Sequence, residues 1–130
     1  MNYYVLNQEL INDPLVRGYS GMSDQEAADD LNIVYRQRNV ASMTGSEVLQ
    51  SVDETEYSAL TDVKKDAFWG LLGIAILDPW GKEADVMLDI FGASTTITNL
   101  NAARVDDISR AIELGLGSVR ESDVVKARAI

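Results

Sequence analysis

The sequence of 130 residues contains neither cysteine nor histidine. Without cysteine the chain has no disulfide, no thiolate nucleophile and no zinc–thiolate site. Without histidine it lacks the commonest general base in enzymes and the commonest protein ligand of transition metals. We therefore expect no metal site, and catalysis would have to rest on carboxylates, hydroxyls or lysines.

Long hydrophobic runs are also scarce. The longest, residues 67–77, is too short to cross a bilayer and is typical of a buried helix. The first ten residues lack the basic region and apolar stretch of a signal peptide. The hydrophobic fraction of 46% is that of an ordinary globular protein. Length and composition together predict one domain over residues 1–130.

The sequence has few basic residues: it contains 21 acidic and 11 basic residues, and its formal net charge is −10. Residues 1–100 hold 16 of the acids and six of the bases, whereas residues 101–130 hold five of each. An acidic body repels nucleic acid and anionic membranes, so we expect neither as a direct partner. The charge either keeps the protein soluble or forms a surface that docks on a basic partner or imitates DNA.

Helix start and stop signals recur along the chain. Ser23–Glu26 and Thr44–Glu47 have the spacing of capping boxes, in which each side chain accepts from the other residue's backbone. Asp13-Pro14 and Asp78-Pro79 end helices, because the residue before proline avoids the α-helical conformation. These signals predict short helices joined by short loops.

Apolar periodicity completes the prediction of an all-α fold. Residues 94–105 are rich in β-branched side chains, but a lone strand has no partner, so we expect helix there. The result is a compact bundle of about seven or eight short helices in a single domain. The expected helices cover 2–11, a segment from Ser23, a segment from Thr44, a turn from Asp53, 62–77, 80–91, 97–104, a segment from Asp106 or Asp107 to Gly115, and 123–129.

The same periodicity predicts the core. Gly70 and Gly73 lie inside the expected helix 62–77, where each costs about 1 kcal/mol relative to alanine. We expect close approach of another helix to compensate for this cost. The residues predicted to be mostly buried are Leu6, Leu10, Leu31, Val48, Phe68, Leu71, Leu72, Ile76, Leu88, Phe91, Leu100, Ile108, Ile112 and Leu116.

The C-terminal stretch 109–129 has some features of a DNA-binding helix-turn-helix, including Ala111 and Gly115 at the required spacing. Glu121, however, stands where that motif needs an apolar residue, and the second helix offers few cations for phosphates. We favour a tight corner instead. In it Gly115 adopts a left-handed conformation, Leu116 folds back onto the helix, and Ser122 opens the last helix.

No catalytic motif is present. The acidic pairs 29–30 and 106–107 are neighbours in sequence, so their members do not share a helix face. The chain lacks a phosphate-binding loop and the GxGxxG, GxSxG and HExxH patterns. Residues 53–56 lack the spacing and glycine of a calcium-binding EF-hand loop. We expect no enzyme activity, no catalytic residues and no cofactor.

Three segments, 10–32, 44–60 and 109–129, resemble a group of small proteins encoded by tailed bacteriophages and prophages. The shared features are Asp13-Pro14-Leu15, Gly18-Tyr19, Ser23-Asp24, Phe91-Gly92 and the stretch 109–117. The resemblance implies a virion or assembly role among the late phage proteins. It implies no enzymatic activity and supplies no catalytic residues.

Two roles follow from that resemblance. The first is a structural or assembly component of the neck, tail or capsid surface, located in the virion or in the host cytoplasm during assembly. Its partners would be other virion proteins or further copies of itself. The alternative is a host-directed inhibitor, an acidic decoy for a DNA-binding or defence protein. Presence in purified particles would distinguish the two.

The expected protein-binding residues are Tyr19, Met22 and Trp80. Tyr19 and Met22 lie in the glycine-containing loop 17–22, which folding alone does not explain. Trp80 follows Pro79, and tyrosine and tryptophan are both enriched at protein interfaces. One hypothesis places these three side chains in an exposed apolar patch. The other is that the two aromatic rings only cover the edge of the core.

Overall fold

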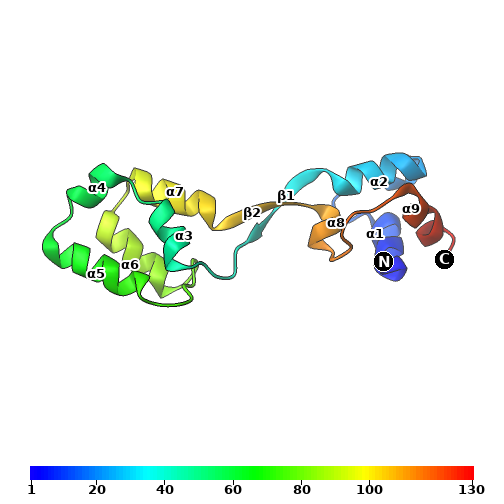
Figure 1. Ribbon diagram of the computed structural model, residues 1–130. Helices are drawn as coiled ribbons and strands as arrows, with labels where there is room; N and C mark the ends of the chain where they lie inside the picture. The colour runs from blue at the N-terminus through cyan, green and yellow to red at the C-terminus, as the bar shows by residue number, and fades with distance from the viewer. The chain divides into compact units, whose positions relative to one another are not determined.

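The computed structural model describes residues 1–130, which form two compact units with separate hydrophobic cores. Unit 1 consists of Met1–Arg38 and Asp107–Ile130, and unit 2 consists of Asn39–Asp106. Both ends of the chain therefore belong to unit 1, and unit 2 is one continuous segment. Helices make up most of each unit (Figure 1).

The fold is mostly helical with one small two-stranded sheet, so the all-α prediction is right only in part. The strands, β1 and β2, pair with each other. In chain order the elements are α1 (Tyr3–Asn12), the 3-10 turn η1 (Tyr19–Gly21), α2 (Asp24–Asn32), β1 (Val34–Asn39), α3 (Gly45–Gln50), α4 (Glu54–Ser58), α5 (Asp62–Leu72), α6 (Lys82–Phe91), α7 (Thr95–Ala103), β2 (Val105–Ser109), α8 (Arg110–Glu113) and α9 (Glu121–Arg128).

The sheet corrects the prediction for residues 106–115. Residues 105–109 form β2, and the helix begins only at Arg110, where the Ser109 hydroxyl accepts from the backbone N–H of Ile112 at 3.1 Å. The partner strand β1 lies about 70 residues earlier in the chain, so no local pattern near β2 indicates the pairing. The preceding segment is helical as expected, with Ser94 rather than Thr95 or Thr96 at the start of α7.

The core of unit 1 lies where α1 and α2 pack against α9. α1 ends at Asn12 and is followed by Asp13, which has φ of 43° and precedes Pro14, so the helix stops where the sequence predicts. The Asp13 carboxylate then accepts from the backbone N–H groups of Arg17 and Gly18, both at 2.7 Å. This turn returns the chain toward α2, whose start has the predicted Ser23–Glu26 capping box.

Ion pairs join distant segments within unit 1. Arg110 donates two hydrogen bonds to the buried Glu9 carboxylate, at 2.8 and 2.9 Å, and also pairs with Glu113. Hydrogen bonding to Glu9 is the main reason that the pKa of Arg110 is raised. Arg17 holds Asp30 in the same two-pronged way, at 2.7 and 3.0 Å. Such bidentate pairs fix the geometry of the elements that carry them.

The C-terminal corner of unit 1 agrees with the bundle interpretation of residues 109–129. Gly115 has φ of 72°, and the N–H of Leu116 donates to the carbonyl of Ala111 at 2.8 Å. Leu116 is buried, so it folds back as predicted. The last helix begins at Glu121 after Arg120, two residues before the expected start at 123 after Ser122, and it packs on α1 and α2.

Unit 2 is organised around aromatic side chains. The Phe68 ring is fully buried and contacts the rings of Tyr57, Trp69 and Phe91 at centroid distances of 5.5–5.8 Å. α3 begins with the predicted Thr44–Glu47 capping box. These contacts place α4, α5 and α6 around one core.

The predicted helix 62–77 ends early, at Leu72, because the residues after it pair elsewhere. Met43 and Leu77 exchange backbone hydrogen bonds of 2.8 and 2.9 Å, which requires an extended chain at Leu77. The predicted close approach at Gly70 is wrong, since a Cβ there would meet nothing within 4 Å, and Gly73 caps α5. The close approach occurs at Gly45, whose Cβ would lie 2.6 Å from the Leu72 carbonyl oxygen.

A polar network fixes the start of α7 in unit 2. The Glu56 carboxylate accepts from the Thr96 hydroxyl at 2.6 Å and from the N–H groups of Thr95 and Thr96 at 2.9 and 2.7 Å. These hydrogen bonds, with the Thr96 hydroxyl first, lower the pKa of Glu56. The Thr96 hydroxyl also accepts from the N–H of Asp53, which caps α4 as predicted.

Most of the residues predicted to lie in the core are buried or partly buried. Three residues are exposed, against expectation: Ile76, Leu88 and Ile112. Ile76 precedes Leu77 in the segment after α5, and it is Leu77 that is buried at the bridge with Met43. Partly buried are Leu72, Phe91 and Leu100, and buried are Leu6, Leu10, Leu31, Val48, Phe68, Leu71, Ile108 and Leu116.

Candidate binding site in unit 2

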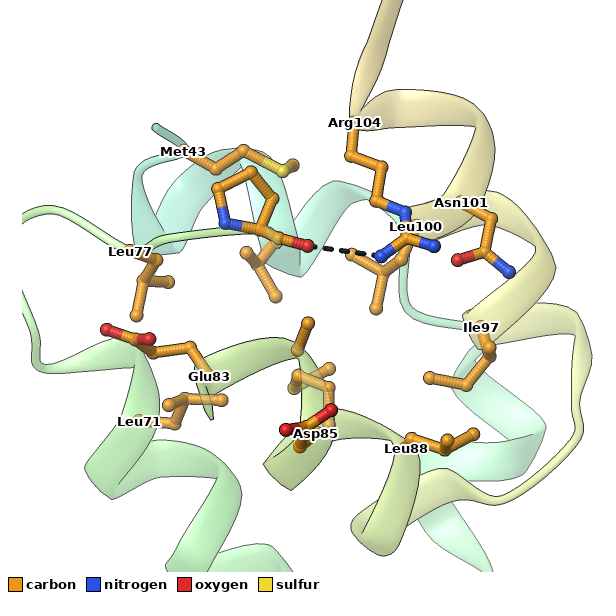
Figure 2. Close-up of a pocket in the computed structure, with 14 residues that line it drawn as sticks. Met43, Leu71, Leu77, Glu83, Asp85, Leu88, Ile97, Leu100, Asn101 and Arg104 are labelled. Carbon is orange, nitrogen blue, oxygen red and sulfur yellow. Dashed lines mark hydrogen bonds between the residues drawn. The ribbon is translucent and has the colours of Figure 1, made fainter. Parts of the chain in front are cut away.

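Unit 2 contains an apolar pocket of about 300 Å³ (Figure 2). This size is at the lower end of the range for ligand pockets and suits one large apolar side chain or a small molecule. Two methionines in the wall add flexible side chains that adapt to different shapes. The apolar wall includes Met43, Leu71, Leu77, Met87, Ile97 and Leu100.

Two helix faces and one backbone bridge build the pocket. Ile97, Leu100 and Arg104 follow one another at intervals of three and four residues, so they share a face of the chain at α7. Ala84 and Leu88 share a face of α6 in the same way. The Met43–Leu77 bridge contributes the side chains of its two residues, and Leu71 and Met87 come from α5 and α6.

Arg104 provides the one cation of the pocket wall. Its Nη1 donates to the carbonyl of Pro79 at 3.2 Å, and its guanidinium carbon lies 3.9 Å from the centre of the Trp80 ring. This cation–π contact holds the side chain over the pocket. Its Nε–H is buried without a hydrogen-bond partner, an arrangement that costs free energy.

Two carboxylates, Glu83 and Asp85, come from the first turn of α6. Figure 2 shows Asp85 and Leu88 on the side of the pocket opposite Arg104. Unit 2 as a whole carries 11 acidic and four basic residues, a formal net charge of −7. The pocket is thus apolar inside, with a cation on one side and unpaired carboxylates on another.

A second apolar surface of unit 2 surrounds Trp69. Trp69, Leu49 and Ile74 are 52%, 44% and 43% exposed, and Leu49 and Trp69 border two shallow depressions. The Trp69 indole N–H donates to the Tyr57 hydroxyl at 2.8 Å, which fixes the ring. Exposed, fixed tryptophans are frequent anchors of protein interfaces.

The predicted protein-binding residues do not share one unit. Tyr19 and Met22 belong to unit 1, and Trp80 belongs to unit 2. The prediction that Tyr19 is exposed is wrong, because its ring is fully buried in the core of unit 1. Met22 is half-buried against that core. Trp80 is 43% exposed, and its role in binding stays a prediction.

Sequence reasoning missed Arg104, which it counted only as one of the cations after residue 100. The signal that identifies it is the spacing of Ile97, Leu100, Asn101 and Arg104, a helical stripe that changes from apolar to cationic. The prediction that Asp78-Pro79 ends a helix is wrong, because α5 ends at Leu72. Pro79 lines the pocket instead.

Comparisons with known proteins add no further constraint on the site. No protein-family model matches the chain. No curated protein and no solved structure matches it either. Within the structure, no helix has the length and apolar character needed to cross a membrane, and no three acidic side chains gather in a way that could hold a metal ion.

Proposed function

We propose that this chain is a structural or assembly protein of a tailed bacteriophage that acts by binding another protein, without catalysis. The observation that carries the binding role is the apolar pocket of unit 2, which has one side formed by exposed residues such as Leu88. The phage context is supported by the sequence resemblance described above. The partner is another virion protein or a further copy of the chain.

Large apolar side chains left in solvent support a binding role for unit 2. Trp69, Trp80, Ile74 and Leu88 are each at least 43% exposed, although their burial would stabilise the protein. Single exposed apolar residues are common, but several that border depressions indicate an interaction surface. Tryptophan adds to this argument, because truncating it at interfaces often costs the most binding energy.

The charge of unit 2 favours a second candidate, an inhibitor that binds a basic host protein. A net charge of −7 on one compact unit attracts basic partners and speeds their association. Proteins that bind DNA have such basic surfaces. This role also depends on protein binding, so the two candidates differ in the partner and in stoichiometry.

Quantitative mass spectrometry of purified particles tests the proposal. We expect the chain in particles at a constant copy number, and we expect Leu88→Lys to lower that number. Val86→Lys is the matched control, because Val86 is an exposed apolar residue of the same helix that does not line the pocket. Absence from particles together with binding to a host protein supports the inhibitor. Absence of both overturns the protein-binding proposal.

A further inference from the structure

We infer that the pocket of unit 2 receives an apolar side chain from a basic amphipathic segment of the partner, with a lysine or arginine of that segment beside Glu83 and Asp85. This inference rests on the proposed protein-binding function and adds the chemistry of the partner. It follows from three properties of the pocket: its apolar interior, its unpaired carboxylates and the way in which Arg104 is already held.

The interior selects an apolar group. Its walls come from leucine, isoleucine and methionine side chains, and its volume of about 300 Å³ accommodates a leucine, methionine or phenylalanine side chain. An amphipathic helix that lays one apolar face into a groove is a frequent mode of peptide recognition. Methionine walls suit this mode because they adjust to different side chains.

The carboxylates select positive charge. Neither Glu83 nor Asp85 is paired with a cation, although both lie in the pocket wall. The first turn of a helix tolerates acids well, so their place at the start of α6 is favourable for folding too. Because both carboxylates border a pocket of an acidic unit, they repel an acidic segment of a partner and favour a basic one.

Arg104 sets the orientation of the bound segment. Its guanidinium is engaged by the Pro79 carbonyl and the Trp80 ring, and it disfavours a second cation on its side of the pocket. The basic residue of the partner therefore lies on the side of Glu83 and Asp85. Backbone carbonyls of the segment lie on the side of Arg104, whose N–H groups are donors only.

Three designed helical peptides test the inference on the full-length protein. They share one apolar face and differ only in flanking residues, which are lysine, glutamine or glutamate. Binding is followed by two-dimensional NMR of the labelled protein at low and high salt. We expect the lysine peptide to bind about tenfold more tightly than the glutamine peptide, as two exposed ion pairs allow. We expect high salt to remove this difference and the glutamate peptide to bind most weakly.

Variants on α6 then locate the contact. Asp85→Lys should abolish the preference for the lysine peptide. Asp89→Lys is the matched control, because it changes the net charge equally on the same helix but Asp89 does not line the pocket. Leu88→Lys should weaken all three peptides, whereas Val86→Lys should not. Far-UV circular dichroism and the melting temperature establish that each variant folds.

The outcomes separate this inference from the proposed function. Equal binding of the lysine and glutamine peptides, or an equal effect of Asp85→Lys and Asp89→Lys, overturns the basic-segment inference. If no peptide binds but Leu88→Lys still lowers incorporation into particles, the basic-segment inference is overturned. The proposed protein-binding function then stands. If no peptide shifts the signals of Ala84, Leu88 or Ile97 and Leu88→Lys particles are normal, the basic-segment inference fails and the pocket is not the surface through which the proposed function acts.

Discussion

The two units use charge differently. Unit 1 carries ten acidic and seven basic residues, and its arginines connect separate segments, as in Arg110 with Glu9 and Arg17 with Asp30. Unit 2 carries 11 acidic and four basic residues, and the ion pairs described above all lie outside it. The arginines of unit 1 therefore contribute to its own structure. In unit 2, by contrast, the carboxylates of Glu83 and Asp85 are not paired with a cation.

Both units leave large apolar side chains exposed, and the units differ in where their aromatic side chains lie. Unit 1 buries Tyr19, Leu6 and Leu31 completely, although both ends of the chain have to meet to form its core. Unit 2 buries Phe68 but leaves Trp69, Trp80 and a pocket accessible. In our proposal, unit 2 carries the binding surface and unit 1 supports it. The predictions below test that division.

Removing the central ring of unit 2 should have the largest effect. Phe68→Ala deletes a fully buried side chain and its aromatic contacts, so we expect a loss of about 3–5 kcal/mol in the free energy of unfolding. Urea denaturation followed by tryptophan fluorescence measures this loss directly, because both tryptophans belong to unit 2. Val63→Ala in the same helix, 79% exposed, should change stability by less than about 0.5 kcal/mol.

The corresponding test in unit 1 breaks an ion pair. Arg110→Ala leaves the Glu9 carboxylate buried without its cation, which costs about 3 kcal/mol. Arg120→Ala, an exposed arginine, serves as the control. Fluorescence reports on unit 2 and far-UV circular dichroism on both units. The single-domain prediction expects both probes to shift together, and a shift in circular dichroism alone would mean that the units unfold separately.

The local signals of the sequence proved more informative than its long-range ones. Capping boxes, the Asp13-Pro14 stop and the corner at Gly115 depend on neighbouring residues, and all three are confirmed. The β1–β2 pairing and the Met43–Leu77 bridge depend on residues far apart in sequence, and neither was predicted. No local pattern specifies which distant segment a strand will meet.

The binding residues illustrate the same limit. Tyr19 between two glycines has the composition of an exposed loop, but the fold brings α1, α2 and α9 around its ring. Trp80 was selected for its residue type, and it is indeed in contact with Arg104 beside the pocket. The pocket itself needs segments from residue 43 to residue 104, so only the stripe on α7 was visible in the sequence.

Glycine substitutions test a finer feature of unit 2. Gly45→Ala places a Cβ 2.6 Å from the Leu72 carbonyl oxygen, and the resulting displacement should cost about 1–3 kcal/mol. Gly70→Ala meets nothing within 4 Å and lies inside α5, so it should stabilise the protein by about 0.5–1 kcal/mol. Thermal melting of the two variants measures both effects. Effects of equal sign would contradict the assignment of the close approach to Gly45.

The smallest expected effect concerns pH and the start of α7. Hydrogen bonds from Thr96 and Thr95 lower the pKa of Glu56, so its charged form is bound more favourably in the folded than in the unfolded protein. The charged carboxylate therefore stabilises the folded state at pH values above 4.5, the ordinary pKa of glutamate. This contribution disappears as the pH falls through the folded-state pKa. Glu56→Gln should therefore be less stable than the parent protein at pH 7 and should approach it below pH 4.5.

Urea midpoints of the parent and of Glu56→Gln, measured from pH 7 to pH 3, test this expectation. Glu54→Gln is the control, because Glu54 lies in the same helix and makes none of the hydrogen bonds to α7. A gap between parent and Glu56→Gln that stays constant over this pH range would show that geometry, not charge, accounts for the contribution of Glu56. In that case Glu56 would stabilise unit 2 through its hydrogen bonds but not through its charge. The contrast with the ion pairs of unit 1 would then become sharper.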